Sequence, residues 1–344
     1  MASPTPLSLQ RLLNQQLSRP RFITAAELVR WFGAVQAQDY LGALWALGLR
    51  MTGATEGDIE DAIAARTIVR TWPMRGTLHF VPAEDSRWML RLLAPRVIAR
   101  SGSRYRELGL DAAVFTRARR LLVRALQGGR RLARHDAYAA IERGGVSAEG
   151  QRGIHILGHL AQQGLICHGP RHGRQPTFVL LDEWVPAAKD LPRDQALPTL
   201  ATRYFASHGP ATVQDFAWWS GLPAREAQAA IDAAGPSIRK AARAARSRAT
   251  TAVLLPPWDE YVVAYKDRAG ALGHLRGDEA GAGMAIGKSL IVIDGRVRGS
   301  WKRELGASTV RLSLGFWTAV SAAERAAVHK AAQRYARFLG RTLL

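Results

Sequence analysis

The chain has 344 residues, of which 47% are hydrophobic, and its 48 Lys and Arg against 28 Asp and Glu give a formal charge of +20. This length exceeds one ordinary core, so we expect two or three domains of roughly 100 to 150 residues each. The charge favours a polyanionic partner, nucleic acid first, and the single cysteine, Cys167, excludes an internal disulfide and a Cys-based zinc site.

Arginine dominates the positive charge, because only six of the 48 cations are lysines. Guanidinium groups suit phosphate oxygens and base edges better than ammonium groups do. The opening residues 1–13 are too polar for a signal sequence, and no stretch approaches the roughly 20 apolar residues that span a bilayer. We therefore expect a cytoplasmic monomer without membrane contact.

The first hundred residues predict four helices followed by a hairpin. Apolar periodicity and capping residues indicate the helices, which cover Leu7–Leu17, Ala25–Phe32 (with Thr24 as N-cap), Leu41–Leu49 and Asp58–Ala65. Strand formers at Ile68–Trp72 and Thr77–Val81 then flank a Pro-Met-Arg-Gly turn. Helices followed by a two-stranded wing are the order of a winged helix.

The second hundred residues repeat this order. Helices are expected at Ala112–Gln127, Ala133–Arg143 and Gln151–Gln163. Strands at Leu165–His168 and Thr177–Leu181 would enclose a basic loop, Gly169–Pro176, as a second wing.

A third copy follows the Pro-rich segment Pro186–Pro198, which we interpret as a linker. Its helices are expected at Asp194–Ser207, Thr212–Ser220 and Pro223–Ala234. The pattern then changes to short strands and a closing amphipathic helix. These elements cover Ala252–Leu255, Leu290–Ile293, Arg296–Trp301, Val310–Leu314 and Ala322–Leu339.

Together these elements predict an α+β fold that is mainly α. It would consist of tandem winged-helix units, each a helix-turn-helix with a β-hairpin wing, and a C-terminal α/β region. The predicted units are residues 1–100, residues 101–190 and residues 191–344.

Charge concentrates in the second unit, where residues 96–175 contain 15 Arg and 5 acids. We expect phosphate contacts there from the helix residues Arg117, Arg120 and Arg124 and from the loop residues Arg171 and Arg174. The alternative is a solvated helix face without a partner.

Two histidines, His155 and His159, lie four residues apart on one expected helix, which is a spacing that zinc ligands can use. No glutamate between them could serve as a base, and no carboxylate completes a ligand set at a familiar spacing. We therefore expect neither a metal nor a cofactor, and we interpret both residues as helix histidines near phosphate.

The segment Gln36-Ala37-Gln38 begins an expected helix and is followed by Asp39. If the turn is extended, both amides lie on nearly the same side and could clamp a water molecule or a base edge. Such a triplet is common in an Ala-rich chain, so spacing alone favours a structural role.

The amino-acid sequence around this segment resembles the AlkZ/YcaQ-like winged-helix DNA glycosylases, and the resemblance extends over nearly the whole chain. The shared motifs lie at residues 28–39, 43–50, 70–81, 255–261, 264–268 and 293–303. The Gln-x-Gln form is closer to the azinomycin-resistance type, AlkZ, than to relatives with Gln-x-Asp. Tyr40 departs from the Pro expected there in many members.

This resemblance implies that Gln36 and Gln38 are catalytic. An N7-alkylated purine carries positive charge and leaves readily, so two amide oxygens that position water and steady an oxocarbenium-like sugar suit the reaction. Asp39 could act as a base or could cap the following helix, and the sequence leaves both open. No lysine precedes Lys189, which predicts a monofunctional enzyme without Schiff-base lyase chemistry.

The first hairpin supplies Arg70, Trp72, Arg75 and His79 near the expected lesion. Arg75 could enter a groove or bind phosphate and Trp72 could stack on bases, or the hairpin could face the core instead. The acids of Trp258–Tyr261, with Lys266 and Arg268 nearby, could form a structural ion network.

The sequence therefore predicts a DNA glycosylase that hydrolyses the N-glycosidic bond of N7-alkylated purines in double-stranded DNA. Its substrates would include alkylated or crosslinked purines made by a genotoxic natural product, in a role of base excision repair or self-resistance. The alternative is a tandem winged-helix transcription regulator without catalysis.

Overall fold

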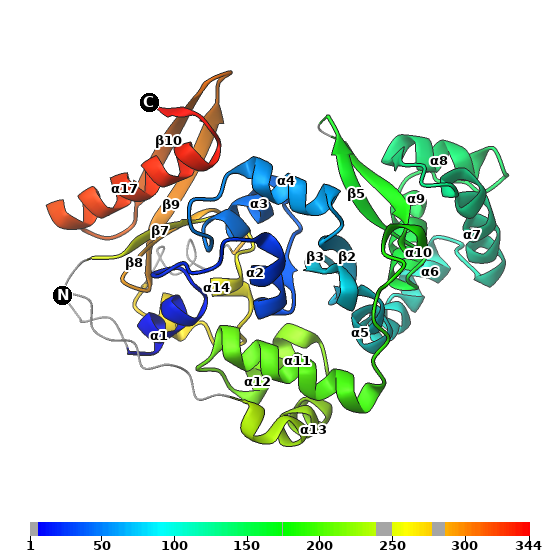
Figure 1. Cartoon of the computed structure of the whole chain (residues 1–344), viewed down its shortest axis with the longest axis horizontal. Helices are drawn as coiled ribbons and strands as arrows, with labels where there is room; N and C mark the ends of the chain where they lie inside the picture. Colours follow the sequence, from blue (N-terminus) through cyan, green and yellow to red (C-terminus); the bar gives the residue numbers. More distant parts are fainter. Residues whose placement is uncertain (1–5, 174, 239–249, 277–285) are drawn as a thin grey trace. The chain divides into compact units, whose positions relative to one another are not determined.

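A computed structural model describes residues 6–173, 175–238, 250–276 and 286–344 (Figure 1). The chain divides into two compact units. Unit 1 combines residues 1–60 with residues 198–344, and unit 2 consists of residues 61–197. This division differs from the three consecutive units 1–100, 101–190 and 191–344, because the first 60 residues pack with the C-terminal part of the chain. The winged-helix character of those three segments stays a prediction.

Nine of the 18 described helices lie entirely within unit 1. They are α1 (Pro6–Asn14), α2 (Ala25–Phe32), α3 (Tyr40–Gly48), α12 (Val213–Ser220), α13 (Ala224–Ala234), η2 (Gly235–Ser237), α14 (Glu260–Val263), α15 (Ala269–Leu272) and α17 (Ala322–Phe338). The chain leaves this unit within α4 (Glu56–Ala64) and returns within α11 (Arg193–His208). The predicted linker is thus shorter than expected, since Pro198 lies inside α11.

A five-stranded sheet completes unit 1, in the order β11-β10-β9-β8-β7. Its strands are β7 (Ala252–Leu255), β8 (Leu290–Ile293), β9 (Arg296–Leu305), β10 (Thr309–Phe316) and β11 (Thr342–Leu343). Neighbours are antiparallel except β10 and β11, which run parallel. A two-residue strand, β1 (Val35–Gln36), precedes α3.

The core of unit 1 anchors α3 against the sheet and α17. Trp45 of α3 packs its ring 4.9 Å from the Tyr335 ring and donates its indole N–H to the Leu254 carbonyl at 2.7 Å. At the end of α3, a Cβ on Gly48 would overlap the ring of Phe338, so only glycine allows this close approach. These contacts hold α3, the helix that follows the glutamine motif.

Unit 2 contains the remaining described helices. They are η1 (Ala83–Asp85), α5 (Ser86–Arg100), α6 (Gly102–Glu107), α7 (Ala112–Leu126), α8 (Arg134–Glu142), α9 (Arg152–Gln162) and α10 (Leu181–Trp184). Its strands are β2 (Ile68–Met74), β3 (Thr77–Pro82), β4 (Leu132–Ala133), β5 (Ile166–His172) and β6 (Gln175–Leu180). β5 and β6 extend into the segment predicted as a wing loop.

The two hairpins that the sequence assigned to separate wings belong to one sheet, in which the strands of unit 2 follow the order β3-β2-β5-β6-β4. β2 and β5 pair antiparallel, with Arg70 opposite His168. Local strand and turn signals predict each hairpin but carry no information about which hairpins pair with each other. Unit 2 is therefore held together across the predicted boundary at residue 100.

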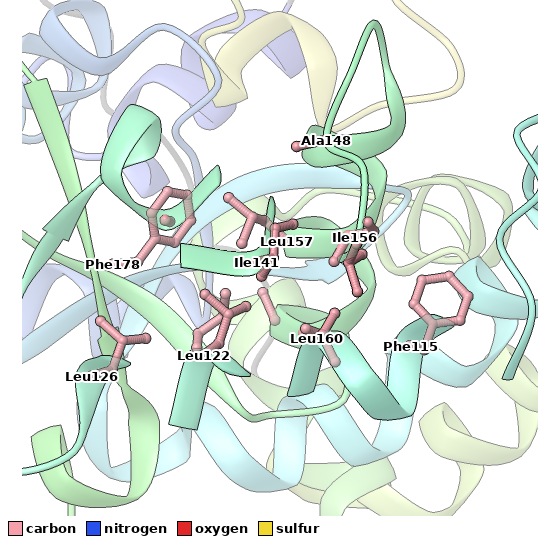
Figure 2. Close-up of a cluster of buried hydrophobic side chains, with 14 of the residues drawn as sticks. Phe115, Leu122, Leu126, Ile141, Ala148, Ile156, Leu157, Leu160 and Phe178 are labelled. Atoms are coloured by element: carbon pink, nitrogen blue, oxygen red, sulfur yellow. The ribbon is translucent and has the colours of Figure 1, made fainter. Parts of the chain in front are cut away.

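One apolar core supports both the hairpins and the helices of unit 2 (Figure 2). It buries Trp72 and Leu78 of the first hairpin together with Leu122 of α7, Ile141 of α8 and Leu160 of α9. Burial of this apolar surface is the main favourable contribution to the unit's stability.

Most of the predicted elements lie within a few residues of their expected positions, whereas α5 and α6 were not predicted from the sequence. Thr24 caps α2 by accepting the Glu27 backbone N–H at 3.3 Å, and β7 and β8 have the predicted bounds. The α+β fold, mainly α, with a C-terminal α/β region is confirmed. Within the described ranges, no helix is long and apolar enough to cross a membrane.

Candidate active site

The Gln-Ala-Gln motif occupies the junction between strand β1 and helix α3. Gln36 ends β1 and is 8% exposed, while Gln38 is exposed directly before the helix. The strand end and the helix start fix the backbone on both sides of the motif. The two glutamines of the prediction therefore lie at one short, well-supported turn.

Asp39 is the N-cap of α3. Its backbone is extended, with φ −88° and ψ 113°, and its Oδ1 accepts the backbone N–H of Gly42 at 2.5 Å. This satisfies one of the backbone donors that a helix leaves free at its start. Of the two roles left open by the sequence, the geometry favours the cap.

Tyr40 is the first residue of α3 and replaces the proline expected in many family members. Proline suits this helix position because no intrahelical partner is needed for its nitrogen. Here the Tyr40 hydroxyl donates to Glu60 Oε2 at 2.8 Å, which ties the start of α3 to α4.

A pocket of about 200 Å³ opens beside the cap of α3. Its lining includes Asp39 and Gly42 together with the polar and aromatic side chains of Ser289, Trp301 and Arg303. The Trp301 indole N–H donates to the Leu255 carbonyl at 2.9 Å, so this wall of the pocket is anchored to the sheet.

The sequence did not identify Glu260 as the residue that binds the backbone of Gln36. The backbone N–H of Gln36 donates to Glu260 Oε1 at 2.6 Å. The other oxygen, Oε2, accepts the indole N–H of Trp219 at 3.1 Å and lies 3.3 Å from His208 Nε2. Glu260 belongs to the Trp258–Tyr261 motif, which the sequence identified without assigning it this task.

Asp259 forms the neighbouring buried ion pair. Both oxygens of Asp259 accept from the Arg50 guanidinium, at 2.7 and 2.8 Å, and Arg50 also donates to Gln15 Oε1 at 2.9 Å. A bidentate pair of this kind satisfies two buried charges at once.

Of the two acids of this motif, Asp259 does form a buried ion pair, but not with Lys266 or Arg268, the cations that the sequence suggested. The Lys266 backbone N–H donates to Asp215 Oδ1, and Arg268 Nε donates to the Val262 carbonyl. Arg50 replaces them as the partner of Asp259, since the fold brings together groups 209 residues apart.

The first hairpin contributes mostly buried side chains. Arg70, Trp72 and His79 are 5%, 8% and 0% exposed, respectively, and Trp72 belongs to the unit 2 core. The expectation that Trp72 stacks on bases does not fit this burial, because core packing covers its ring. Arg75 lies half-buried at the turn, and its Nη2 is 3.3 Å from His79 Nε2.

The α7 side chains that were predicted to contact phosphate lie on the surface. Arg117, Arg120 and Arg124 are exposed, while Leu122 of the same helix points into the core. Arg171 is half-buried in β5, and Arg174 lies outside the described residues. The exposed arginines of α7 are free to meet phosphate oxygens.

The histidine pair of α9 packs as part of unit 2. His159 stacks on Phe115, with ring centroids 3.7 Å apart, and burial lowers its pKa to about 4. His159 is therefore a neutral imidazole in an aromatic cluster on a helix, and its exposed fraction of 7% does not fit the expected position near phosphate.

The fold and this junction define the class of protein. The model of the "DNA glycosylase AlkZ-like" family matches residues 29–338, and the chain belongs to this family. The resemblance found in the sequence is thereby confirmed.

The comparisons also find two similar proteins from Streptomyces sahachiroi. An interstrand DNA cross-link repair glycosylase is 28% identical over 232 residues, which cover 62% of this chain and 58% of that relative. The solved structure of DNA glycosylase AlkZ matches with a TM-score of 0.76 and 23% identity over the full length of both chains. This structural likeness shows that the two share a fold.

Proposed function

We propose that the protein is a monofunctional DNA glycosylase that hydrolyses the N-glycosidic bond of N7-alkylated purines. The observation that carries this proposal is the placement of Gln36 and Gln38 between the end of β1 and the capped start of α3. The motif lies in a chain of the AlkZ-like DNA glycosylase family, where the resemblance assigns catalysis to this pair.

In the proposed reaction the two carboxamide oxygens accept hydrogen bonds from one water molecule. The water oxygen attacks C1′ while the C1′–N9 bond breaks, and the bonding electrons leave with the purine. The cationic N7-alkylpurine departs as a neutral base, the sugar becomes an abasic site, and the water proton passes to solvent. Because alkylation has already made the base a good leaving group, positioning and dipoles are enough.

We propose that the substrates include crosslinked or bulky N7 adducts, as in a role of repair or self-resistance. Support comes from the relative that is named an interstrand cross-link repair glycosylase, of which the match covers 58%. A crosslinked base cannot turn out of the duplex alone, so an open surface at the motif suits it better than a tight base pocket. Gln38 is exposed at this junction.

The exposed arginines of α7 would supply binding that does not depend on sequence. Arg117, Arg120 and Arg124 would neutralise backbone phosphates. Arg75, at the turn of the first hairpin, remains our candidate for a groove or phosphate contact. The alternative of a transcription regulator finds no support in the comparisons.

The proposal is tested with duplex DNA that contains N7-methylguanine or an N7 crosslink, followed by alkali to reveal abasic sites. We expect abasic sites only with alkylated DNA and no strand cleavage before alkali. Gln36→Ala and Gln38→Ala should each lower the single-turnover rate by about 100-fold or more, with similar DNA affinity. Arg225→Gln, at an exposed site of α13, is the control and should retain the wild-type rate.

Two results would overturn the proposal. If the wild-type protein forms no abasic sites on either substrate, the protein is not a glycosylase for these lesions. Full activity in both glutamine variants would move the chemistry to other residues. Strand cleavage without alkali would contradict the monofunctional mechanism alone.

A further inference from the structure

Glu260 is a completely buried carboxylate, since its side chain is 0% exposed. A buried carboxylate costs several kcal/mol unless hydrogen bonds compensate it. Among the described residues, the nitrogen atoms close to this group include the Gln36 backbone nitrogen at 2.6 Å, Trp219 Nε1 at 3.1 Å and His208 Nε2 at 3.3 Å. The first two can only donate, so both oxygens act as acceptors, as an ionised carboxylate requires.

The partner His208 is also completely buried, and burial lowers its pKa. Because an ionised carboxylate can only accept, His208 Nε2 must carry a proton and donate it to Glu260, while Nδ1 lies 2.8 Å from the Ser207 hydroxyl oxygen. Tyr204 stacks on the other face of the ring, with centroids 4.6 Å apart. The imidazole is therefore fixed in position and keeps one N–H directed at the carboxylate.

The three donors come from three different parts of unit 1. His208 ends α11, Trp219 lies near the end of α12, and Gln36 ends β1. His208 and Trp219 contact the carboxylate through their side chains, whereas Gln36 donates its backbone N–H. The carboxylate thus transmits the fixed positions of α11 and α12 to the residue that begins the Gln-Ala-Gln turn.

We propose that Glu260, held by His208 and Trp219, is a positioning residue that fixes Gln36 for glycosidic bond hydrolysis. The inference rests on the proposed function. Two carboxylates fix the backbone on the two sides of the motif. Asp39 caps the helix that follows the motif, and Glu260 accepts a hydrogen bond from the end of the strand that precedes it. The Gln36 side chain then projects from a backbone that cannot shift, which is the preorganisation that a water-positioning group needs.

Glu260→Gln is the first test. The carboxamide keeps the volume and one acceptor for Gln36, but its NH₂ group meets the Trp219 N–H, and two donors repel. We expect a single-turnover rate on N7-methylguanine DNA reduced by about 10-fold or more, with DNA affinity within about two-fold of wild type. Rates are measured at a temperature at which circular dichroism shows every variant folded.

Glu324→Gln is the matched control. Glu324 is 9% exposed, completes the capping box of α17 with the N-cap Ser321 and lies 3.5 Å from the Arg298 guanidinium, and none of its recorded hydrogen bonds within the described residues reaches the motif. This variant should lose stability but retain the wild-type rate. An equal loss of rate in Glu324→Gln and Glu260→Gln would reduce the effect to general loosening of the unit and overturn the proposal.

A pair of variants at His208 serves if Glu260→Gln does not fold. In His208→Gln the side-chain amide nitrogen still donates to Glu260, so the variant should retain most of the wild-type rate. In His208→Leu the donor is lost, and the rate should fall several-fold. Equal rates in the two folded variants would overturn the proposal. An inactive wild-type protein would instead refute the proposed function, so the two failures are distinguishable.

Discussion

Substitution of Asp39 separates the two roles that the sequence left open. Asparagine caps a helix as well as aspartate does, but its amide cannot act as a base. Alanine can act neither as a cap nor as a base. In the structure Asp39 Oδ1 accepts the Gly42 N–H at 2.5 Å, a bond that an asparagine carbonyl oxygen can reproduce. Asp39→Asn therefore preserves the cap and removes only the base.

The size of each effect follows from the surroundings of α3. Loss of an N-cap costs about 1 kcal/mol of the free energy of unfolding, which corresponds to a melting temperature lower by about 2 °C in a chain of this size. The helix itself should persist, because Trp45 remains bonded to the Leu254 carbonyl at 2.7 Å and residues Gly42–Gly48 are buried. We expect this loss in Asp39→Ala and less than half of it in Asp39→Asn.

The assay combines urea unfolding with single-turnover cleavage of N7-methylguanine DNA at saturating protein. General base catalysis contributes about 100-fold or more to a rate. If Asp39 is a cap only, Asp39→Asn should react within about 3-fold of wild type. A loss of about 100-fold in Asp39→Asn at unchanged stability would refute the cap and identify Asp39 as the base.

Three further predictions concern packing, DNA affinity and acid stability. Gly48→Ala should lower the free energy of unfolding by about 1–3 kcal/mol in urea titrations, because the new Cβ would overlap the Phe338 ring. Removal of three phosphate contacts should reduce the slope of log Kd against log salt by about 2.7. The substitutions are Arg117→Gln, Arg120→Gln and Arg124→Gln. His159→Phe should reduce the loss of stability between pH 7 and pH 5. The pKa of this buried histidine falls to about 4, so below 6.5 the unfolded chain binds a proton that the folded chain refuses until about pH 4.

Each of these predictions has a control within the chain. Gly57→Ala, at an exposed site of α4 with only Thr55 Oγ1 near its new Cβ, should not destabilise the protein. Exposed His135 should leave the pH dependence unchanged when replaced by Gln. An unchanged salt slope in the triple arginine variant would exclude α7 from the DNA interface. Equal acid sensitivity of His159→Phe and wild type would assign the acid response to other groups.

Local features were predictable because a few consecutive residues encode them. Thr24 and Asp39 both carry the side-chain acceptor that a helix start requires, and both cap helices in the structure. The amphipathic pattern of residues 322–339 gave the closing helix to within one residue. The Gln-Ala-Gln motif stood out only through the neighbouring motifs, since its own spacing is uninformative.

The tertiary structure decided what depends on partners that are distant in sequence. Glu260 and Gln36 are 224 residues apart, and no local pattern tells which buried acid meets which backbone group. The same holds for Arg50 as the partner of Asp259, and for the two hairpins that share one sheet. Burial of Trp72 likewise depends on the helices that cover it. Helix caps, turns and hydrophobic periodicity depend on a few consecutive residues, whereas the pairing of buried charges and of sheet edges is set only when the whole chain packs.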